Sequence, residues 1–172
     1  MPQLAGETIL ASDIAPVRFV QKAAIETVTS SATLQNDDDL VLIPMAANKI
    51  YRVEVRLACT STAVGINTQW VLAGGVAQLT TKSNVGIGPA ATSVSAATTV
   101  RVDRSNITTA VPWGAGWTAG QTAHLEQEFL IETTTSGTAG TITLQWCQVT
   151  SNASGTALTT GSYLIITEVE AA

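Results

Sequence analysis

Residues 50–57 read Ile-Tyr-Arg-Val-Glu-Val-Arg-Leu, and this stretch decides the fold class. Apolar side chains alternate there with the charged side chains of Arg52, Glu54 and Arg56. A period of two puts the two kinds of side chain on opposite faces of an extended chain. The stretch therefore predicts a β-strand with one buried face and one solvated face.

The same alternation recurs in residues 122–133 and 141–149. Other segments are rich in β-branched residues and are also predicted as strands. These segments are residues 17–29, 40–43, 67–73, 98–103 and 162–169. Asn, Asp, Gly and Ser cluster between most of the predicted strands, as turns require, and helical periodicity is nearly absent. The pattern predicts an all-β fold, an antiparallel β-sandwich that is jelly-roll-like.

The first 16 residues precede the first predicted strand and are expected to form a short extended arm. We therefore divide the chain into an N-terminal arm (1–16) and a β-sandwich domain (17–172). Arms of this kind become ordered when they bind a partner. The apolar side chains of the arm are candidates for such assembly contacts: Leu4, Ile9, Leu10 and Ile14. A second unusual segment, 74–97, is rich in Gly, Ala, Ser and Thr and is predicted as a long loop.

A further glycine-rich loop is predicted over residues 111–121, and it carries Trp113 and Trp117. An aromatic side chain in such a loop either anchors a partner or folds back over one end of the sandwich, and stacking on a sugar ring is a third interpretation. We take both residues as candidates for partner contact. Trp70 and Trp146 lie within predicted strands and are expected in the core.

Composition excludes several classes of function. The chain has 172 residues, enough for one domain, and a net charge of −5. Charged residues make up 12% of it, against about 25% in typical soluble domains. With 27 Thr and 25 Ala, the surface is solvated by hydroxyl groups more than by charges. The acidic balance argues against a nucleic-acid partner. The apolar runs are far shorter than the roughly 20 residues of a membrane-spanning helix, which argues against a membrane partner.

The chain is poorly supplied with catalytic groups. His124 is its only histidine, and no nearby nucleophile and acid complete a triad with it. We expect His124 to be a half-buried structural side chain. One histidine with two separated cysteines also falls short of the four ligands of a zinc site. We therefore predict no catalytic residues, no cofactor, no metal and no enzymatic activity.

Two groups of acidic residues are candidate sites. The run Asp37–Asp39 is dense enough to suggest a calcium loop, but a solvated turn that caps a hairpin is favoured. Glu126, Glu128 and Glu132 alternate on one face of a strand, which raises the interpretation of paired carboxylates for glycoside cleavage, but the three share that one face and no complementary acid motif is visible. A solvated or subunit-facing acidic strip is favoured there as well.

The two cysteines, Cys59 and Cys147, lie inside apolar strand patterns. A free cysteine in such a position behaves as a small buried hydrophobe. We expect buried free thiols, while one disulfide between the two remains an alternative.

Several longer motifs carry a resemblance to a known family. Residues 28–40 read Val-Thr-Ser-Ser-Ala-Thr-Leu-Gln-Asn-Asp-Asp-Asp-Leu, and residues 44–54 read Pro-Met-Ala-Ala-Asn-Lys-Ile-Tyr-Arg-Val-Glu. Residues 137–146 read Gly-Thr-Ala-Gly-Thr-Ile-Thr-Leu-Gln-Trp, followed by Thr-Ser-Asn at 150–152 and Gly-Ser-Tyr-Leu at 161–164. This pattern resembles a β-domain common in virion proteins of tailed bacteriophages, especially those of actinobacteria. The arm, at residues 4–13, is similar to a leader seen in phage structural proteins.

The resemblance spans roughly residues 17–169, except for a middle part at about 74–120. It implies a virion structural protein, a homotrimer without enzymatic activity, and it supplies no catalytic residues. The expected role is that of a capsid-surface decoration or cement protein that binds the major capsid protein and stabilises the head. The alternative is a tail-tip or fibre protein that contacts the host surface with the loop of Trp113 and Trp117. A lectin-like module acting alone is a more distant alternative.

Overall fold

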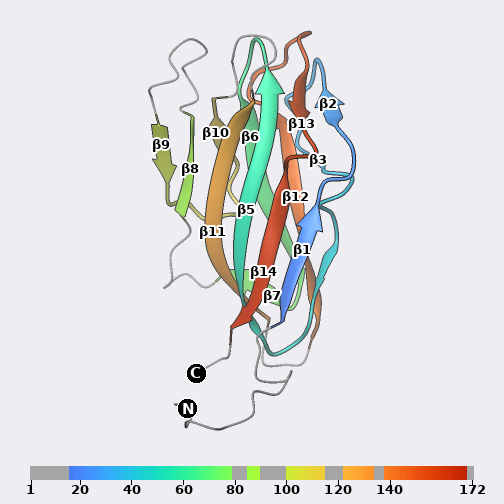
Figure 1. Cartoon of the computed structure of the whole chain (residues 1–172), viewed down its shortest axis with the longest axis vertical. Coiled ribbons are helices and arrows are strands. Elements are labelled where there is room, and N and C mark those ends of the chain that lie inside the picture. The colour runs from blue at the N-terminus through green and yellow to red at the C-terminus, as the bar shows by residue number, and fades with distance from the viewer. Residues whose placement is uncertain (1–15, 79–84, 90–99, 115–121, 134–137, 170–172) are drawn as a thin grey trace, which may run out of the picture.

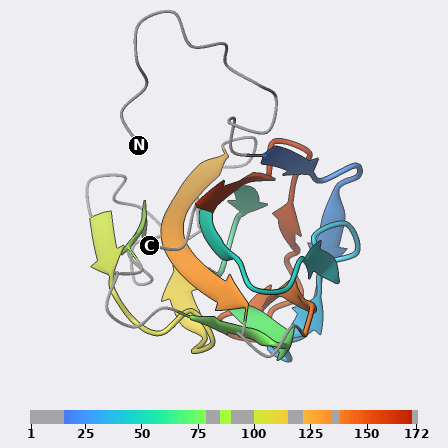
Figure 2. The same cartoon turned by 90° about the horizontal axis from the view of Figure 1, so that it is seen from below.

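The computed structural model describes residues 16–78, 85–89, 100–114, 122–133 and 138–169. Two antiparallel sheets pack face to face, as Figures 1 and 2 show from two directions. The predicted all-β sandwich is confirmed. The arm residues 1–15 lie outside the described part of the chain. No helix among the described residues is long and apolar enough to cross a membrane.

Nine strands form the first sheet, called here the large sheet. Its main order is β1 (Val17–Gln21), β14 (Tyr163–Val169), β5 (Ile50–Ser61), β11 (Ala123–Thr133), β8 (Val85–Pro89) and β9 (Val100–Asp103). Three short strands extend it: β2 (Glu26–Val28), β7 (Val76–Gln78) and β13 (Thr156–Leu158). The two edges of the main order are therefore β1 and β9.

Five strands form the second sheet, called here the small sheet. Its order is β10 (Val111–Trp113), β6 (Ile66–Gly74), β12 (Gly140–Gln148) and β3 (Gln35–Asn36), and β4 (Ile43–Met45) also pairs with β12. The long strands β5 and β6 follow each other in the chain but lie in opposite sheets, as do β11 and β12. Consecutive long strands thus alternate between the sheets, which is the jelly-roll-like connectivity that was expected.

The core lies between the sheets and is built by the period of two. In the large sheet, Val53 pairs with Phe129 and Leu57 pairs with Leu125, and all four side chains are buried. The side chains that alternate with this buried set, such as Arg52 and Glu126, face outward. The predicted burial of Trp70 and Trp146 in the core is confirmed as well.

Three sequence predictions of local structure are corrected. The predicted strand 17–29 is divided into β1 and β2, because the chain turns at Lys22–Ile25. The predicted strand 40–43 is wrong: β4 begins only at Ile43, since Leu42 has a left-handed backbone with φ of 49°. The predicted loop 74–97 contains two strands, β7 and β8.

Candidate interaction surface

Trp113 lies in the core and does not reach the surface. Its side chain is 0% exposed, and its indole Nε1 donates a hydrogen bond to Thr68 Oγ1 at 2.9 Å. The prediction that Trp113 contacts a partner is therefore wrong, and the alternative that it folds back over one end of the sandwich holds. Trp117 lies outside the described residues, as do the four candidate arm residues Leu4, Ile9, Leu10 and Ile14.

Two glycines of β8 explain how Trp113 is covered. A Cβ atom on Gly86 would stand 2.9 Å from Trp113 Cη2, and one on Gly88 would stand 2.8 Å from Trp113 Cε3. Such distances are shorter than van der Waals contact, so β8 passes over the indole ring only because both positions lack a side chain. The Arg101 guanidinium also lies over the ring, with Cζ 5.7 Å from the ring centroid.

The predictions for the two cysteines and for the histidine have different outcomes. Cys59 and Cys147 are buried free thiols, as expected, and burial raises the pKa of Cys59 to about 12. His124 is exposed on β11, so the expectation of a half-buried side chain is wrong. Its backbone pairs with Ala58 of β5, at a position that faces away from the core.

A buried lysine organises the acidic run that was predicted as a turn. The Lys22 side chain is 0% exposed, and its ammonium group lies 2.9 Å from Asp37 Oδ2 and 2.5 Å from Asp38 Oδ1. Glu26 Oε2 at 3.3 Å and Asp39 Oδ2 at 3.5 Å complete its surroundings. We call these five residues the Lys22 cluster. It ties the β1–β2 connection to the turn before β4.

The turn is more ordered than the sequence suggested. Asp37 is fully buried, and its Oδ1 accepts hydrogen bonds from the backbone N–H groups of Asp39 and Leu40. Asp39 Oδ2 accepts from Ala23 N at 2.9 Å. Hydrogen bonding to the ammonium lowers the pKa of Asp38, whereas burial raises the pKa of Glu26.

Carboxylate oxygens of Glu26, Asp37 and Asp38 lie close enough together to share a metal ion. The Lys22 ammonium already supplies the positive charge at this place and donates to the same oxygens. The turn is therefore stabilised by an internal cation, and the calcium interpretation gains no support from the geometry.

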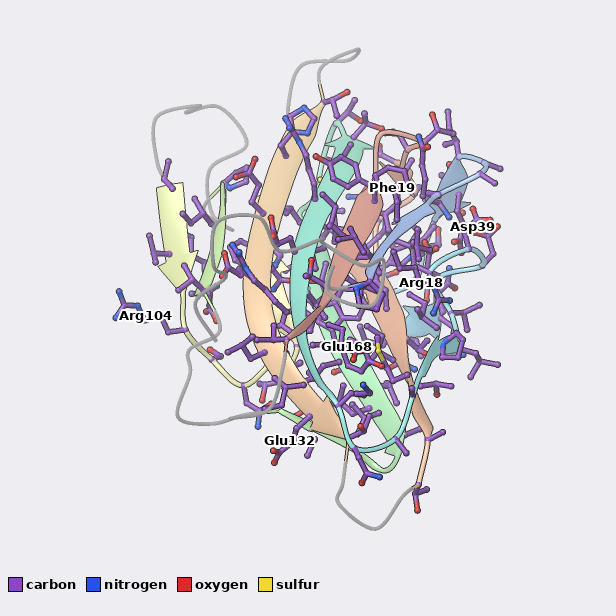
Figure 3. All side chains as sticks on the ribbon, turned by 60° about the horizontal axis from the view of Figure 1, so that its bottom comes forward. Arg18, Phe19, Asp39, Arg104, Glu132 and Glu168 are labelled. Carbon is purple, nitrogen blue, oxygen red and sulfur yellow. The ribbon has the colours of Figure 1, made fainter. Side chains whose placement is uncertain are left out.

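The outer face of the large sheet is the main candidate surface. Among the described residues, most of the exposed large apolar side chains lie on this one face, and Figure 3 shows Phe19 there. They fall into two groups at opposite sides of the sheet, called here the β1 flank and the β9 flank. The β1 flank holds Val17, Phe19 and Val169, and the β9 flank holds Ile87, Val100 and Val102.

A ladder of charged side chains separates the two flanks. Arg52 Nε lies 2.9 Å from Glu128 Oε1, and its Nη2 lies 3.0 Å from Oε2, which is a bidentate pair. Arg52 also approaches Glu54 at 3.5 Å, and Arg56 approaches Glu126 at 4.0 Å. Of the acids in the predicted strip, Glu126 and Glu128 are thus each paired with an arginine of β5, which favours a solvated or subunit-facing strip over the carboxylate pair of a glycosidase.

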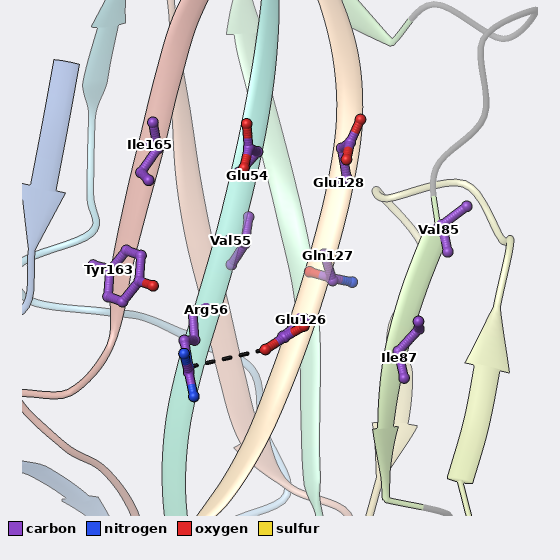
Figure 4. A pocket seen from close by; sticks show the side chains of 10 residues that line it. All are labelled: Glu54, Val55, Arg56, Val85, Ile87, Glu126, Gln127, Glu128, Tyr163 and Ile165. Carbon is purple, nitrogen blue, oxygen red and sulfur yellow. Dashed lines mark ion pairs between the residues drawn. The ribbon is translucent and has the colours of Figure 1, made fainter. Parts of the chain in front are cut away.

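A shallow hollow of about 330 Å³ lies along this ladder (Figure 4). Its floor is formed by β5 and β11, with Glu54, Arg56 and Glu126 among the lining side chains. Apolar side chains from the neighbouring strands complete it: Val85, Ile87 and Ile165. Apolar walls beside paired charges can receive a side chain of another protein, because such a contact buries the walls without breaking an ion pair.

We expect the charged ladder to contribute little to folding. Replacing Arg52 with alanine should lower the free energy of unfolding by less than about 1 kcal/mol, because exposed ion pairs are weak and screened. Urea denaturation of the Arg52→Ala and Glu128→Gln variants would measure this. A loss above about 2 kcal/mol in either variant would show that the face is built for stability and not for contact.

Comparison with known proteins assigns no family. No protein-family model and no curated protein matches the chain. It is similar to a chain in the structure of the infectious bursal disease virus Gt strain, with a TM-score of 0.26, 10% identity, and coverage of 98% of this chain and 47% of that one. A chain of the T13 IBDV viral particle is similar with a TM-score of 0.27, 13% identity, and coverage of 99% and 44%.

This protein therefore spans less than half the length of these viral chains. Both likenesses are too weak to assign a function.

Proposed function

We propose that this chain is a structural protein of a tailed-bacteriophage virion, and that it decorates the capsid surface. In this role it binds the major capsid protein and stabilises the head without catalysing a reaction. The protein acts as a homotrimer, with the N-terminal arm reaching the shell or a neighbouring subunit. The sequence motifs support the class of particle.

The outer face of the large sheet is the observation that carries the proposal. Phe19 is 57% exposed and Val102 is 58% exposed, each beside other apolar side chains. Exposed apolar patches on small domains mark contact with other proteins. In the charged ladder between the flanks, Glu128 is paired with Arg52 and Glu126 with Arg56. The face therefore offers contact area to a partner, as a decoration protein requires.

The position of the protein on the particle can be tested by locating and counting its copies. We expect labelled copies to be spread in large number over the head, and heads stripped of the protein to release DNA at a lower temperature. Adding back purified protein should restore the stability of the head. A few copies confined to one end of the tail would contradict the proposal and favour the tail-tip or fibre role.

The outer face can be tested with one matched pair of variants. Phe19→Asp should weaken binding to stripped heads at least about tenfold, because an apolar anchor that loses its contact costs 1.4 kcal/mol or more. Val71→Asp is the control, since Val71 is 36% exposed on the outer side of the small sheet. Equal binding by both variants, with unchanged melting temperatures, would remove the outer face from the interface.

One of the two residues that supported the tail-tip alternative is not at the surface. It depended on Trp113 and Trp117 together, and Trp113 is buried. A Trp117→Ala variant that loses adsorption to the host, with heads of normal stability, would nevertheless favour it.

A further inference from the structure

We propose that β9 is a docking edge for a second copy of this chain, in which two β9 strands pair antiparallel about a two-fold axis at Val102. The strand ends the main order of the large sheet and pairs with β8 on one side. Within the described ranges, no strand pairs with its other side, and Figure 1 shows β9 as the outermost arrow of the sheet. Unpaired strand edges are templates for strand addition.

The backbone of Val102 is directed to the open side. Pro89 pairs with Val100 and lacks an N–H group, so this pair cannot exchange two hydrogen bonds. Hydrogen-bonded and non-hydrogen-bonded pairs alternate along an antiparallel ladder. By this alternation, Arg101 bonds to Gly88 of β8, and Val102 turns its N–H and C=O groups away from β8.

Charge complementarity selects the register. Val100 and Val102 face outward, whereas Arg101 and Asp103 face the other side of the sheet and pair with each other at 2.7 Å. With Val102 opposite Val102 of the second copy, each Arg101 stands opposite an Asp103. Shifting the axis to Arg101 or to Asp103 would instead oppose two like charges, which is destabilising. The strand is therefore self-complementary in one register, as a two-fold contact requires.

The same register gathers apolar side chains on the outer face. Val102 is 58% exposed, and Ile87 beside it on β8 is 45% exposed. Val102 would lie next to its copy across the axis, with Ile87 on the far side of each Val102, while Val100 would lie opposite Arg104. Arg104 follows β9 directly and points away from the sandwich (Figure 3). Its aliphatic stem can cover a valine while its charge stays in water.

The contact involves few residues, so we expect weak association in free solution and strong association where many copies are held together. On a particle it would join neighbouring copies across a two-fold axis. The inference concerns the strand edge itself and stands whether or not the protein sits on a capsid.

Cysteine crosslinking of the purified full chain tests the register. In an antiparallel pair, facing residues have Cα atoms about 5.5 Å apart, which is within the range of a disulfide. Val102→Cys should therefore form a covalent dimer on mild oxidation. Val100→Cys is the matched control on the same strand and the same face. Its Cα atom would lie more than about 13 Å from its copy, because four residue steps separate them.

We expect Val102→Cys to crosslink at least tenfold faster than Val100→Cys. The wild type should not crosslink, since Cys59 and Cys147 are buried. Equal rates for the two variants, or a faster rate for Val100→Cys, would overturn the register. Absence of crosslinking in both variants would overturn the docking edge.

A second measurement covers the case of misfolded cysteine variants. In sedimentation at increasing concentration, the wild type should associate through β9, whereas Val102→Lys should keep the mass that it has at low concentration, because two lysines would meet at the axis. Val17→Lys on the opposite edge strand β1 is the control, and it should associate like the wild type. Equal association of Val102→Lys and the wild type would contradict the inference.

Discussion

Replacing Lys22 with methionine is expected to lower the free energy of unfolding by about 3–5 kcal/mol, because it leaves buried carboxylates without their cation. Asp37 is 0% exposed and cannot regain water in the native state. The other three carboxylates of the Lys22 cluster would repel the Asp37 carboxylate across the place that the ammonium group occupies in the wild type. Methionine keeps the length and apolar stem of lysine, so the loss reports the charge and its hydrogen bonds more than packing.

Lys49 supplies the matched control. Its ammonium pairs with Glu168, but the Lys49 side chain is 44% exposed, so the pair is largely solvated. Lys49→Met should therefore cost less than about 1 kcal/mol. Urea denaturation of both variants at neutral pH makes the comparison. Similar small losses for Lys22→Met and Lys49→Met would show that the Lys22 cluster is an ordinary surface network.

The pKa shifts in the Lys22 cluster also predict how its contribution to the free energy of unfolding depends on pH. The pKa of Lys22 is raised above its ordinary value of 10.5, so the stability it adds is complete below pH 10.5 and is lost as pH rises through the raised value. The pKa of Asp38 is lowered below its ordinary 3.8, so its contribution is present above pH 3.8 and is lost as pH falls through the lowered value. Glu26 acts in the opposite direction, since burial raises its pKa.

The difference between the wild type and Lys22→Met should therefore shrink on acidification. Protonation removes the repulsion among the carboxylates of the variant, while it removes ion pairs from the wild type. Adding Asp37→Asn to Lys22→Met should recover part of the lost stability at neutral pH for the same reason. A difference that stays constant between pH 7 and pH 4 would mean that packing, and not charge, explains the loss.

The long strands could be predicted from the sequence because their signal is local. In β5 and β11, most of the alternate, buried residues are apolar, and the register of the two strands brings these residues together. The strand β8 could not be predicted. Glycines disfavour strands in isolation, and Gly86 and Gly88 are required because Trp113, more than twenty residues later, packs beneath them, together with Leu125 at Gly88.

The Lys22 cluster shows the same limit for a site. Lys22 reads as one polar residue in a strand-like stretch, and Asp37–Asp39 reads as a solvated turn. Lys22 meets these acids only because the chain returns from β2 to the turn before β4. No local pattern in the sequence predicts this return. An isolated lysine between two apolar segments, followed by a dense acidic run, is the only sequence signal that pointed toward it.

Trp113→Ala is expected to lower the free energy of unfolding by about 3–5 kcal/mol, the usual cost of truncating a large buried aromatic side chain. The side chain is 0% exposed, and its loss leaves Thr68 without the indole donor at 2.9 Å. Trp113→Phe should cost less, because most of the ring volume remains. Denaturant titration measures both. A loss below about 1 kcal/mol for Trp113→Ala would place the indole outside the core.

Coupling between Trp113 and Gly86 tests why β8 has glycines. A Cβ atom on Gly86 would lie 2.9 Å and 3.1 Å from two indole carbons, but at an ordinary 3.4 Å from Gln127 Cγ. In the wild type, Gly86→Ala should therefore cost about 1–3 kcal/mol through overpacking. In the Trp113→Ala background the clash is gone, and the same substitution should be neutral or slightly stabilising, because alanine restricts the unfolded chain more than glycine. Additive losses in the double variant would show that the glycine serves the backbone of β8 and not the indole beneath it.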